Sequence, residues 1–195
     1  MPNYIGTGLP DVAEAHYIDW VPIQKVVCGG ESSVTFSGMN SDFDEYKFEM
    51  RSIHPGTDNV YLSWQANAVG GDGFNETITS TAYRAYMQED DSGGSVDYRT
   101  GEDQAQGTSF EYVVDNTGGD ADQCMTADLV IYAPSNTTFV THFQLEGTSQ
   151  MSSDGEKHDM RAGYIHTSSA IDQIQFKFSS GNIDSGTITM FGLSK

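Results

Sequence analysis

Residues 46–51 read YKFEMR and residues 60–66 read VYLSWQA, and these two segments decide the fold class. In both segments apolar and polar side chains alternate, so one face of an extended chain is apolar and the other is polar. Alternation with a period of two is typical of a strand in an antiparallel sheet that is buried on one side. The segment 54–59 between them reads HPGTDN, which has the composition of a tight connection. The sequence therefore predicts two consecutive strands with buried faces.

The same alternation returns in residues 127–133, 139–145 and 173–178. The inward-facing positions predicted there are Ala127, Leu129, Ile131, Ala133, Phe139, Thr141, Phe143, Leu145, Ile174, Phe176 and Phe178. Residues 133–136 and 179–182 have turn compositions and are predicted to form hairpins. Short strands with turn signals about every ten residues predict an all-β fold, an antiparallel β-sandwich of jelly-roll-like type. Residues 82–88 are the one stretch whose composition suits a helix.

The composition supports this fold class. The chain has 195 residues, with 21 Gly and 20 Ser but only 5 Leu, which favours short strands and turns over helices. Its length fits one domain. Residues 1–20 lack alternation and include Gly6, Gly8 and Pro10. We therefore expect an extended N-terminal docking arm over residues 1–20 and a single β-sandwich domain over residues 21–195.

The charge of the chain excludes two classes of partner. Nine Lys and Arg face 28 Asp and Glu, which gives a formal net charge of −19. Such a surface repels nucleic-acid phosphates and anionic membranes, so we expect no nucleic acid and no membrane as partners. The first twenty residues have neither the basic head nor the apolar run of a secretory signal peptide. Cys28 and Cys124 are expected to be two buried thiols, with a disulfide as the alternative.

The sequence predicts no catalytic residue, no cofactor and no resident metal. It lacks the motifs of serine hydrolases, phosphate-binding loops and zinc proteases. His54 precedes a proline in a turn, where its ring can bond the backbone, and His16, His142, His158 and His166 have similarly ordinary contexts. Residues 89–91 are adjacent acids whose side chains diverge, so they form a solvated loop more readily than a glycosidase pair. We therefore expect a protein that is not an enzyme.

Two alternatives concern binding. Asp115, Asn116, Asp120 and Asp122 lie around two glycines and offer the oxygen ligands that calcium prefers, although the EF-hand spacing is absent. The tyrosines expected to face outward are Tyr61, Tyr83, Tyr86, Tyr98 and Tyr132. Outward aromatic side chains can stack on sugars or fill a subunit interface. We favour the interface.

The C-terminal segment resembles a known group of proteins. Residues 170–193 read AIDQIQFKFSSGNIDSGTITMFGL and resemble the closing hairpin of virion structural proteins of marine tailed bacteriophages, which commonly read SGNIxSGTIxLYGI. Here MFGL at residues 190–193 replaces LYGI. Residues 46–48, 53–55, 57–59, 81–83 and 133–138 also match, and residues 4–8, YIGTG, resemble short attachment arms.

The resemblance implies a jelly-roll-like module on a particle surface, often trimeric, without catalytic residues. Together with the composition, it predicts a non-enzymatic structural protein of a tailed-phage virion. We expect a homo-oligomeric decoration or accessory subunit, a trimer, docked on head or tail proteins of the capsid particle. The alternative is a tail-fibre-type module for host recognition that binds a receptor or a host surface glycan.

Overall fold

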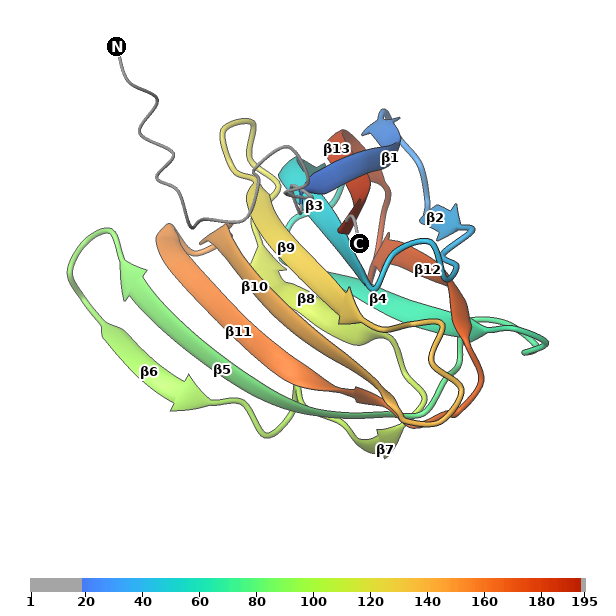
Figure 1. The fold of residues 1–195 in the computed structure, drawn as a ribbon. Coiled ribbons are helices and arrows are strands. Elements are labelled where there is room, and N and C mark those ends of the chain that lie inside the picture. Colours follow the sequence, from blue (N-terminus) through green and yellow to red (C-terminus); the bar gives the residue numbers. More distant parts are fainter. Residues whose placement is uncertain (1–18, 194–195) are drawn as a thin grey trace, which may run out of the picture.

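The structure is a computed structural model and describes residues 19–193. Within that range the chain forms β-strands and no helix (Figure 1). The strands are β1 (Trp20–Cys28), β2 (Val34–Ser37), β3 (Glu45–Pro55), β4 (Val60–Ala68), β5 (Ile78–Gln88), β6 (Gly94–Tyr98), β7 (Ala105–Gly107), β8 (Glu111–Thr117), β9 (Met125–Tyr132), β10 (Thr141–Met151), β11 (Gly155–Ile165), β12 (Ile171–Phe178) and β13 (Ile183–Leu193). The predicted all-β class is confirmed.

The strands form one continuous antiparallel sheet that folds into two layers packed face to face, which we call the large and the small sheet. The large sheet has the order β1-β13-β3-β9-β10-β11-β5-β6, and β7 pairs with one end of β5. The small sheet has the order β8-β4-β12-β2. Met151 of β10 pairs with Thr117 of β8, which joins the two sheets along one side. The molecule is thus a jelly-roll-like β-sandwich, as predicted.

The core lies between the small sheet and the middle of the large sheet. Phe48 of β3 packs against Phe36 of β2 and Phe176 of β12, with ring centroids 5.4 and 5.5 Å apart. Trp64 of β4 meets Phe143 of β10 edge-on at 4.9 Å. These aromatic contacts bridge the two sheets and bury large apolar side chains, which is the main source of stability in such a sandwich.

Most of the predicted inward positions are confirmed. The alternating residues of β3, β4, β9 and β12 point into the core, and Tyr46, Phe48 and Met50 are at most 1% exposed. Phe139 was expected in the core but is 71% exposed, because β10 begins only at Thr141. Ala133 follows β9 and adopts a positive φ of 46°, so it belongs to the turn. The prediction of a helix over residues 82–88 is wrong. This stretch is part of β5, which pairs with β11 on one side and with β6 on the other.

The two predicted hairpins have different outcomes. Residues 133–136 do connect a hairpin, since β9 and β10 pair directly. Residues 179–182 instead connect the two sheets: β12 pairs with β4 and β2, whereas β13 pairs with β1 and β3. The segment 56–59 crosses between sheets in the same way, from β3 to β4. A turn composition marks where a strand ends, but the burial of the next apolar face decides which sheet that strand joins.

The ends of the described region bear on the predicted arm. Trp20, assigned to the arm from the sequence, is the first residue of β1 and pairs with Leu193. Residues 1–18 of the arm lie outside the described residues. Both cysteines are free thiols, Cys28 buried and Cys124 partly buried. Among the described residues no helix is long and apolar enough to cross a membrane.

Candidate functional site

The large sheet extends beyond the small sheet, and in this extension charged side chains take the inward positions that apolar side chains take over the core. In Figure 1, β5 and β6 form the free end of the large sheet, with β11 next to them. On β11 the inward side chains are Lys157, Asp159 and Arg161, which are at most 3% exposed. Their outward neighbours include Met160, which is 41% exposed. In this part of the sheet the Lys and Arg side chains point inward together with Asp159, and the outward face carries apolar side chains such as Met160 beside the acids Glu146 and Glu156.

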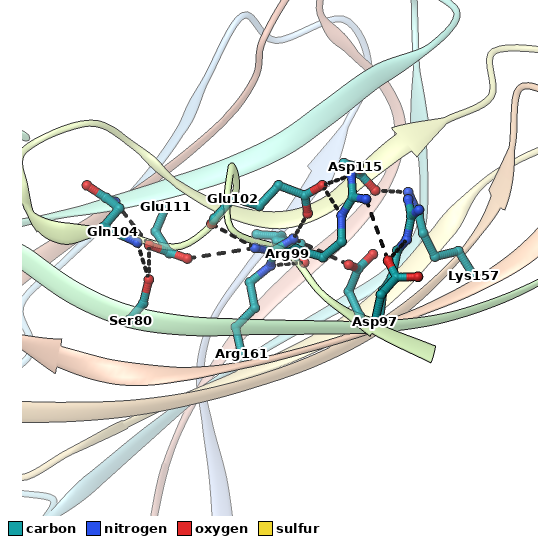
Figure 2. Close-up of polar contacts among 12 residues, drawn as sticks. Ser80, Asp97, Arg99, Glu102, Gln104, Glu111, Asp115, Lys157 and Arg161 are labelled. Atoms are coloured by element: carbon teal, nitrogen blue, oxygen red, sulfur yellow. Dashed lines mark hydrogen bonds and ion pairs between the residues drawn. The ribbon is translucent and has the colours of Figure 1, made fainter. Parts of the chain in front are cut away.

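The inward charges form one cluster between this end of the sheet and the segment that follows β6 (Figure 2). We call it the ionic cluster, and its members are Arg84, Asp97, Arg99, Glu102, Glu111, Asp115, Lys157, Asp159 and Arg161. It contains four basic and five acidic residues. The whole chain has only nine Lys and Arg, so almost half of its basic side chains lie in this cluster.

Arg161 lies at the centre of the ionic cluster. Its Nη2 atom donates to Glu102 Oε2 at 2.7 Å and to Asp159 Oδ1 at 3.3 Å. Its Nη1 atom donates to the backbone carbonyl of Glu102 at 3.0 Å and lies 4.0 Å from Glu111 Oε1. Because both Glu102 contacts involve the segment between β6 and β7, Arg161 holds that segment against the sheet.

A second set of ion pairs extends the cluster towards β6. Arg99 donates to Glu102 Oε1 at 2.8 Å through Nε, and its Nη2 lies 3.8 Å from Asp115. Arg84 pairs with Asp97 across β5 and β6, with 3.0 Å between Nε and Oδ2. Lys157 pairs with Asp115 of β8, which ties the large sheet to the small sheet. The strands and the loop are therefore held together by charge where the apolar core ends.

Glu111 ends the cluster on the other side. Its Oε2 atom accepts hydrogen bonds from the Ser80 hydroxyl at 2.9 Å and from the Gln104 amide at 3.0 Å. The Ser80 hydroxyl also accepts from the backbone N–H of Gln104 at 2.9 Å. These neutral donors satisfy one oxygen of a carboxyl that is only 1% exposed, and the other oxygen, Oε1, accepts no hydrogen bond from any described residue. They also fix Gln104, so the loop is anchored at both Glu102 and Gln104.

Burial and charge pairing shift the pKa values of the cluster in opposite directions. Burial raises the pKa of Glu111 and of Asp159, and the neighbouring Arg161 offsets only part of this increase. Burial also acts to raise the pKa of Glu102, but hydrogen bonds from Arg161 and Arg99 outweigh it and the pKa is lowered. Burial lowers the pKa of Lys157 to about 8, against the attraction of Asp159. With one more acid than base, the cluster becomes neutral when one carboxyl keeps its proton.

Three carboxyl groups of the cluster approach each other as metal ligands do. Glu102, Asp115 and Asp159 can place one oxygen each within 4.8 Å of one another. However, Lys157 pairs with Asp115, and Arg161 bridges Glu102 and Asp159. The places that a cation would take are therefore filled by the chain's own ammonium and guanidinium groups. We interpret the cluster as a charge-balanced replacement for an apolar core.

The outer face of the same strands carries exposed apolar side chains. We call this surface the outer patch, and its members are Tyr83 (45% exposed), Met87 (53%), Val96 (77%), Tyr98 (42%) and Met160 (41%). Met160, Tyr83 and Tyr98 are register neighbours on β11, β5 and β6, and the two tyrosine rings meet edge-on at 5.2 Å. Ala85 and Val96 form the next row. A groove of about 360 Å³ continues from Tyr83 and Met160 towards β10 and β9.

The residues singled out in the sequence have varied positions. Of the tyrosines expected to face outward, Tyr83 and Tyr98 belong to the outer patch, and Tyr61 and Tyr132 are half-buried on outer faces. Tyr86 is the exception, because it lies on the inward side of β5. The guanidinium carbon of Arg84 lies over its ring, 4.9 Å from the ring centroid.

The predicted calcium ligands do not share one site. Asp115 points into the ionic cluster, and Asn116 accepts a hydrogen bond from the Ser152 hydroxyl at 2.6 Å. Asp120 and Asp122 are exposed beyond them. The alternation of side chains in β8 separates adjacent residues, so closeness in sequence does not bring these oxygens together.

The described histidines have ordinary partners. His54 Nδ1 lies 2.8 Å from the carbonyl of Gln123, which is the backbone bond expected for it. His158 contacts Glu146 and His166 contacts Gln106, each at 2.8 Å, while His142 packs edge-on against Tyr164. His16 lies outside the described residues.

Comparison of the chain with protein-family models, with curated proteins and with solved structures found no match.

Proposed function

We propose that this protein is a non-enzymatic structural subunit that assembles on other proteins, and specifically a decoration or accessory subunit of a tailed-phage virion. The observation that supports an assembly function is the reversed end of the large sheet. A strand on the surface of a monomer normally turns its charges to water and its apolar side chains inward. The outer patch does the opposite over three adjacent strands, and contiguous exposed apolar surface of this kind marks sites of protein association.

The cost of the reversal supports the same conclusion. Burying charged side chains such as Lys157, Asp159 and Arg161 stabilises a fold less than burying apolar groups of the same size would. A sheet end selected for stability alone would place Met160 and Val96 inside and the charges outside. If another protein covers the outer face, its apolar side chains become buried in the assembly, and the charges on the inner face are the consequence of reserving those apolar side chains for the partner. The assignment to a virion rests on the resemblance of residues 170–193 and on the acidic, catalytically silent composition.

The test combines location and surface. Quantitative mass spectrometry of purified particles, against the major capsid protein, measures the copy number: hundreds of copies indicate head decoration, and a dozen or a few dozen indicate the tail. Particles that contain no copy of the chain reject the virion assignment. The double variant Met87→Ser/Val96→Ser should remain folded but lose incorporation, whereas Phe139→Ser, an exposed apolar control far from the patch, should incorporate normally.

The predicted docking arm is tested on the same particles. Deletion of residues 1–18 removes the arm and leaves β1 intact. We expect a folded domain that no longer joins particles, because an extended segment can dock on the sheet edge or groove of another protein. Normal incorporation of the truncated chain would reject the arm and leave the outer patch as the docking element.

A second candidate function, glycan binding, is favoured by one pocket. The segment between β6 and β8 and the start of β8 line an open pocket of about 340 Å³ that includes Phe110, Tyr112 and Asp103. Tyr61 packs on Tyr112 with ring centroids 4.2 Å apart, and Lys177 lies over the Phe110 ring. Aromatic walls with a carboxyl and peptide groups suit a neutral sugar, and the pocket is at the small end of ligand sites.

This candidate is tested by ligand-observed NMR with methyl glycosides at millimolar concentration. Binding should disappear in Asp103→Ala and persist in the outer-patch variant Met87→Ser. If glycosides bind Asp103→Ala as they bind the wild-type chain, or if no glycoside binds the wild-type chain, this pocket is not a sugar site. The host-recognition alternative would then lose its structural support.

A further inference from the structure

We infer that the partner of the outer patch is a different protein, whose docking surface has an apolar centre and a basic rim. This inference rests on the proposed assembly function and specifies the partner for that site. It follows from the charges around the outer patch, which all have the same sign, and from the placement of the basic residues on the strands that carry it.

The sheet register places acidic side chains around the outer patch, and we call them the acidic rim. Glu146 of β10 is the register neighbour of Met160, and Glu156 of β11 is the register neighbour of Met87. The turn between β5 and β6 adds three acids at residues 89–91. Beyond the opposite end of the patch, the Tyr98 hydroxyl donates to Asp103 at 2.6 Å. Carboxylates therefore border the patch on three sides.

No Lys or Arg of β5, β6, β10 or β11 lies beside these acids on the outer face. β6 and β10 contain neither Lys nor Arg, and the three basic residues of β5 and β11, Arg84, Lys157 and Arg161, all point into the ionic cluster. The nearest outward base is His158, which lies 2.8 Å from Glu146. Farther along the outer face, Arg51 pairs with Asp128 and Glu49. The ionic cluster thus withdraws the positive charge of these strands from the surface.

A second copy of the chain fits this surface poorly. In a two-fold interface the same patch meets itself, so rim carboxylates would face rim carboxylates. Such pairs repel, and the net charge of −19 adds a long-range repulsion at low salt. A partner with Lys or Arg around an apolar centre meets both features at once. A sheet or a helix with such a surface can pack on the outer face at about 10 Å.

The chain itself can be converted into this partner, which gives a test that needs no identified ligand. The triple variant Glu89→Lys/Glu146→Lys/Glu156→Lys keeps the apolar centre and makes the rim basic. A control with the same net charge, Asp42→Lys/Asp122→Lys/Asp184→Lys, changes three exposed acids away from the patch. Circular dichroism confirms that both variants are folded, and sedimentation velocity measures the association of each with the wild-type chain.

We expect the wild-type chain and the triple variant each to be free of association through this face. Their mixture should form a one-to-one complex, with a dissociation constant at least about tenfold lower than that of the control mixture. Adding salt should weaken the complex, because exposed charges are screened within about 8 Å at physiological ionic strength. Introducing Val96→Ser into either component should abolish it.

Three outcomes would overturn the inference. If the wild-type chain pairs with itself and Val96→Ser abolishes that pairing, the partner is a second copy, and the assembly function stands. If the folded triple variant does not bind the wild-type chain, a basic rim is not what the patch selects. If both mixtures associate equally, the attraction depends on net charge and not on the patch. Loss of particle incorporation in the outer-patch variant remains the separate test of the proposed function.

Discussion

Replacement of Arg161 by Met is the sharpest test of how this fold is held together. The guanidinium is fully buried and donates to Glu102 and Asp159, and it lies 4.0 Å from Glu111. Met fills a similar length without a charge or a donor. The substitution leaves three buried carboxyl groups without their shared cation, and it frees the segment that Arg161 holds through the Glu102 carbonyl.

The expected magnitude follows from the number of lost partners. Breaking a buried ion pair by removing one member costs roughly 3–5 kcal/mol, and we expect about 4 kcal/mol here. Unfolding entropy near 2.1 cal/mol/K per residue amounts to about 0.4 kcal/mol/K for this chain, so Tm should fall by about 10 °C. The loss should be smaller at acidic pH than at neutral pH, because burial already raises the pKa of Glu111 and Asp159 and both accept protons readily there. Urea unfolding at the two pH values and a thermal scan measure these quantities.

Arg51→Met is the matched control. Arg51 also forms two ion pairs, at 2.7 Å to Asp128 and 3.4 Å to Glu49, but its side chain is 42% exposed. Exposed pairs contribute about 0–1 kcal/mol, so this variant should be close to the wild-type chain in stability. Equal, small losses in both variants would refute the view that buried charge pairing holds the free end of the large sheet.

Three further predictions follow from other parts of the structure. Burial raises the pKa of Glu111 in the folded chain above its value in the unfolded chain, so this carboxyl costs stability as the pH rises above the unfolded value. Glu111→Gln should therefore stabilise the fold at neutral pH. Urea titrations should show that this gain in stability vanishes near pH 4. Gly147→Ala should cost about 1–3 kcal/mol in chemical denaturation, since its Cβ would lie 2.8 Å from Ala127 and 2.9 Å from Val114; an unchanged midpoint would mean that the sheets separate easily. Val96→Ser should change the free energy of unfolding by no more than about 0.5 kcal/mol, because the side chain is 77% exposed, and a larger loss would show that it packs within the monomer.

The sequence predicted the core well and the site poorly, for one physical reason. Alternation identifies which residues share a face of a strand, and apolar residues identify the buried face when the strand lies over the core. Residues 155–161 read GEKHDMR, and Lys157, Asp159 and Arg161 share one face. The usual expectation that charged side chains face the solvent predicts that this face is exposed, whereas it is buried in the structure. The signal that was present is the alternation of sign, since positive, negative and positive side chains two residues apart can neutralise one another.

The partners of β11 could not be found from local pattern at all. Glu102, Glu111 and Asp115 come from a loop and from β8, about 40 to 60 residues earlier in the chain, and only the packing of the two sheets brings them to Arg161 and Lys157. The crossing at residues 179–182 was missed for a related reason. A turn signal is local, but the choice between pairing with the previous strand and joining the opposite sheet depends on distant apolar faces.

The ionic cluster and the outer patch are two faces of the same three strands, and each accounts for the other. With four of nine basic residues inside, the rest of the chain has five basic and 23 acidic residues, so nearly the whole negative charge lies outside the cluster. Under the proposed assembly function, this charge makes free subunits repel one another despite the exposed apolar patch. Contact with a basic-rimmed partner removes that repulsion and buries the patch in one step. Damage to the cluster, as in Arg161→Met, should then loosen β5, β6 and β11 and weaken docking on the opposite face, although no residue of the outer patch has changed.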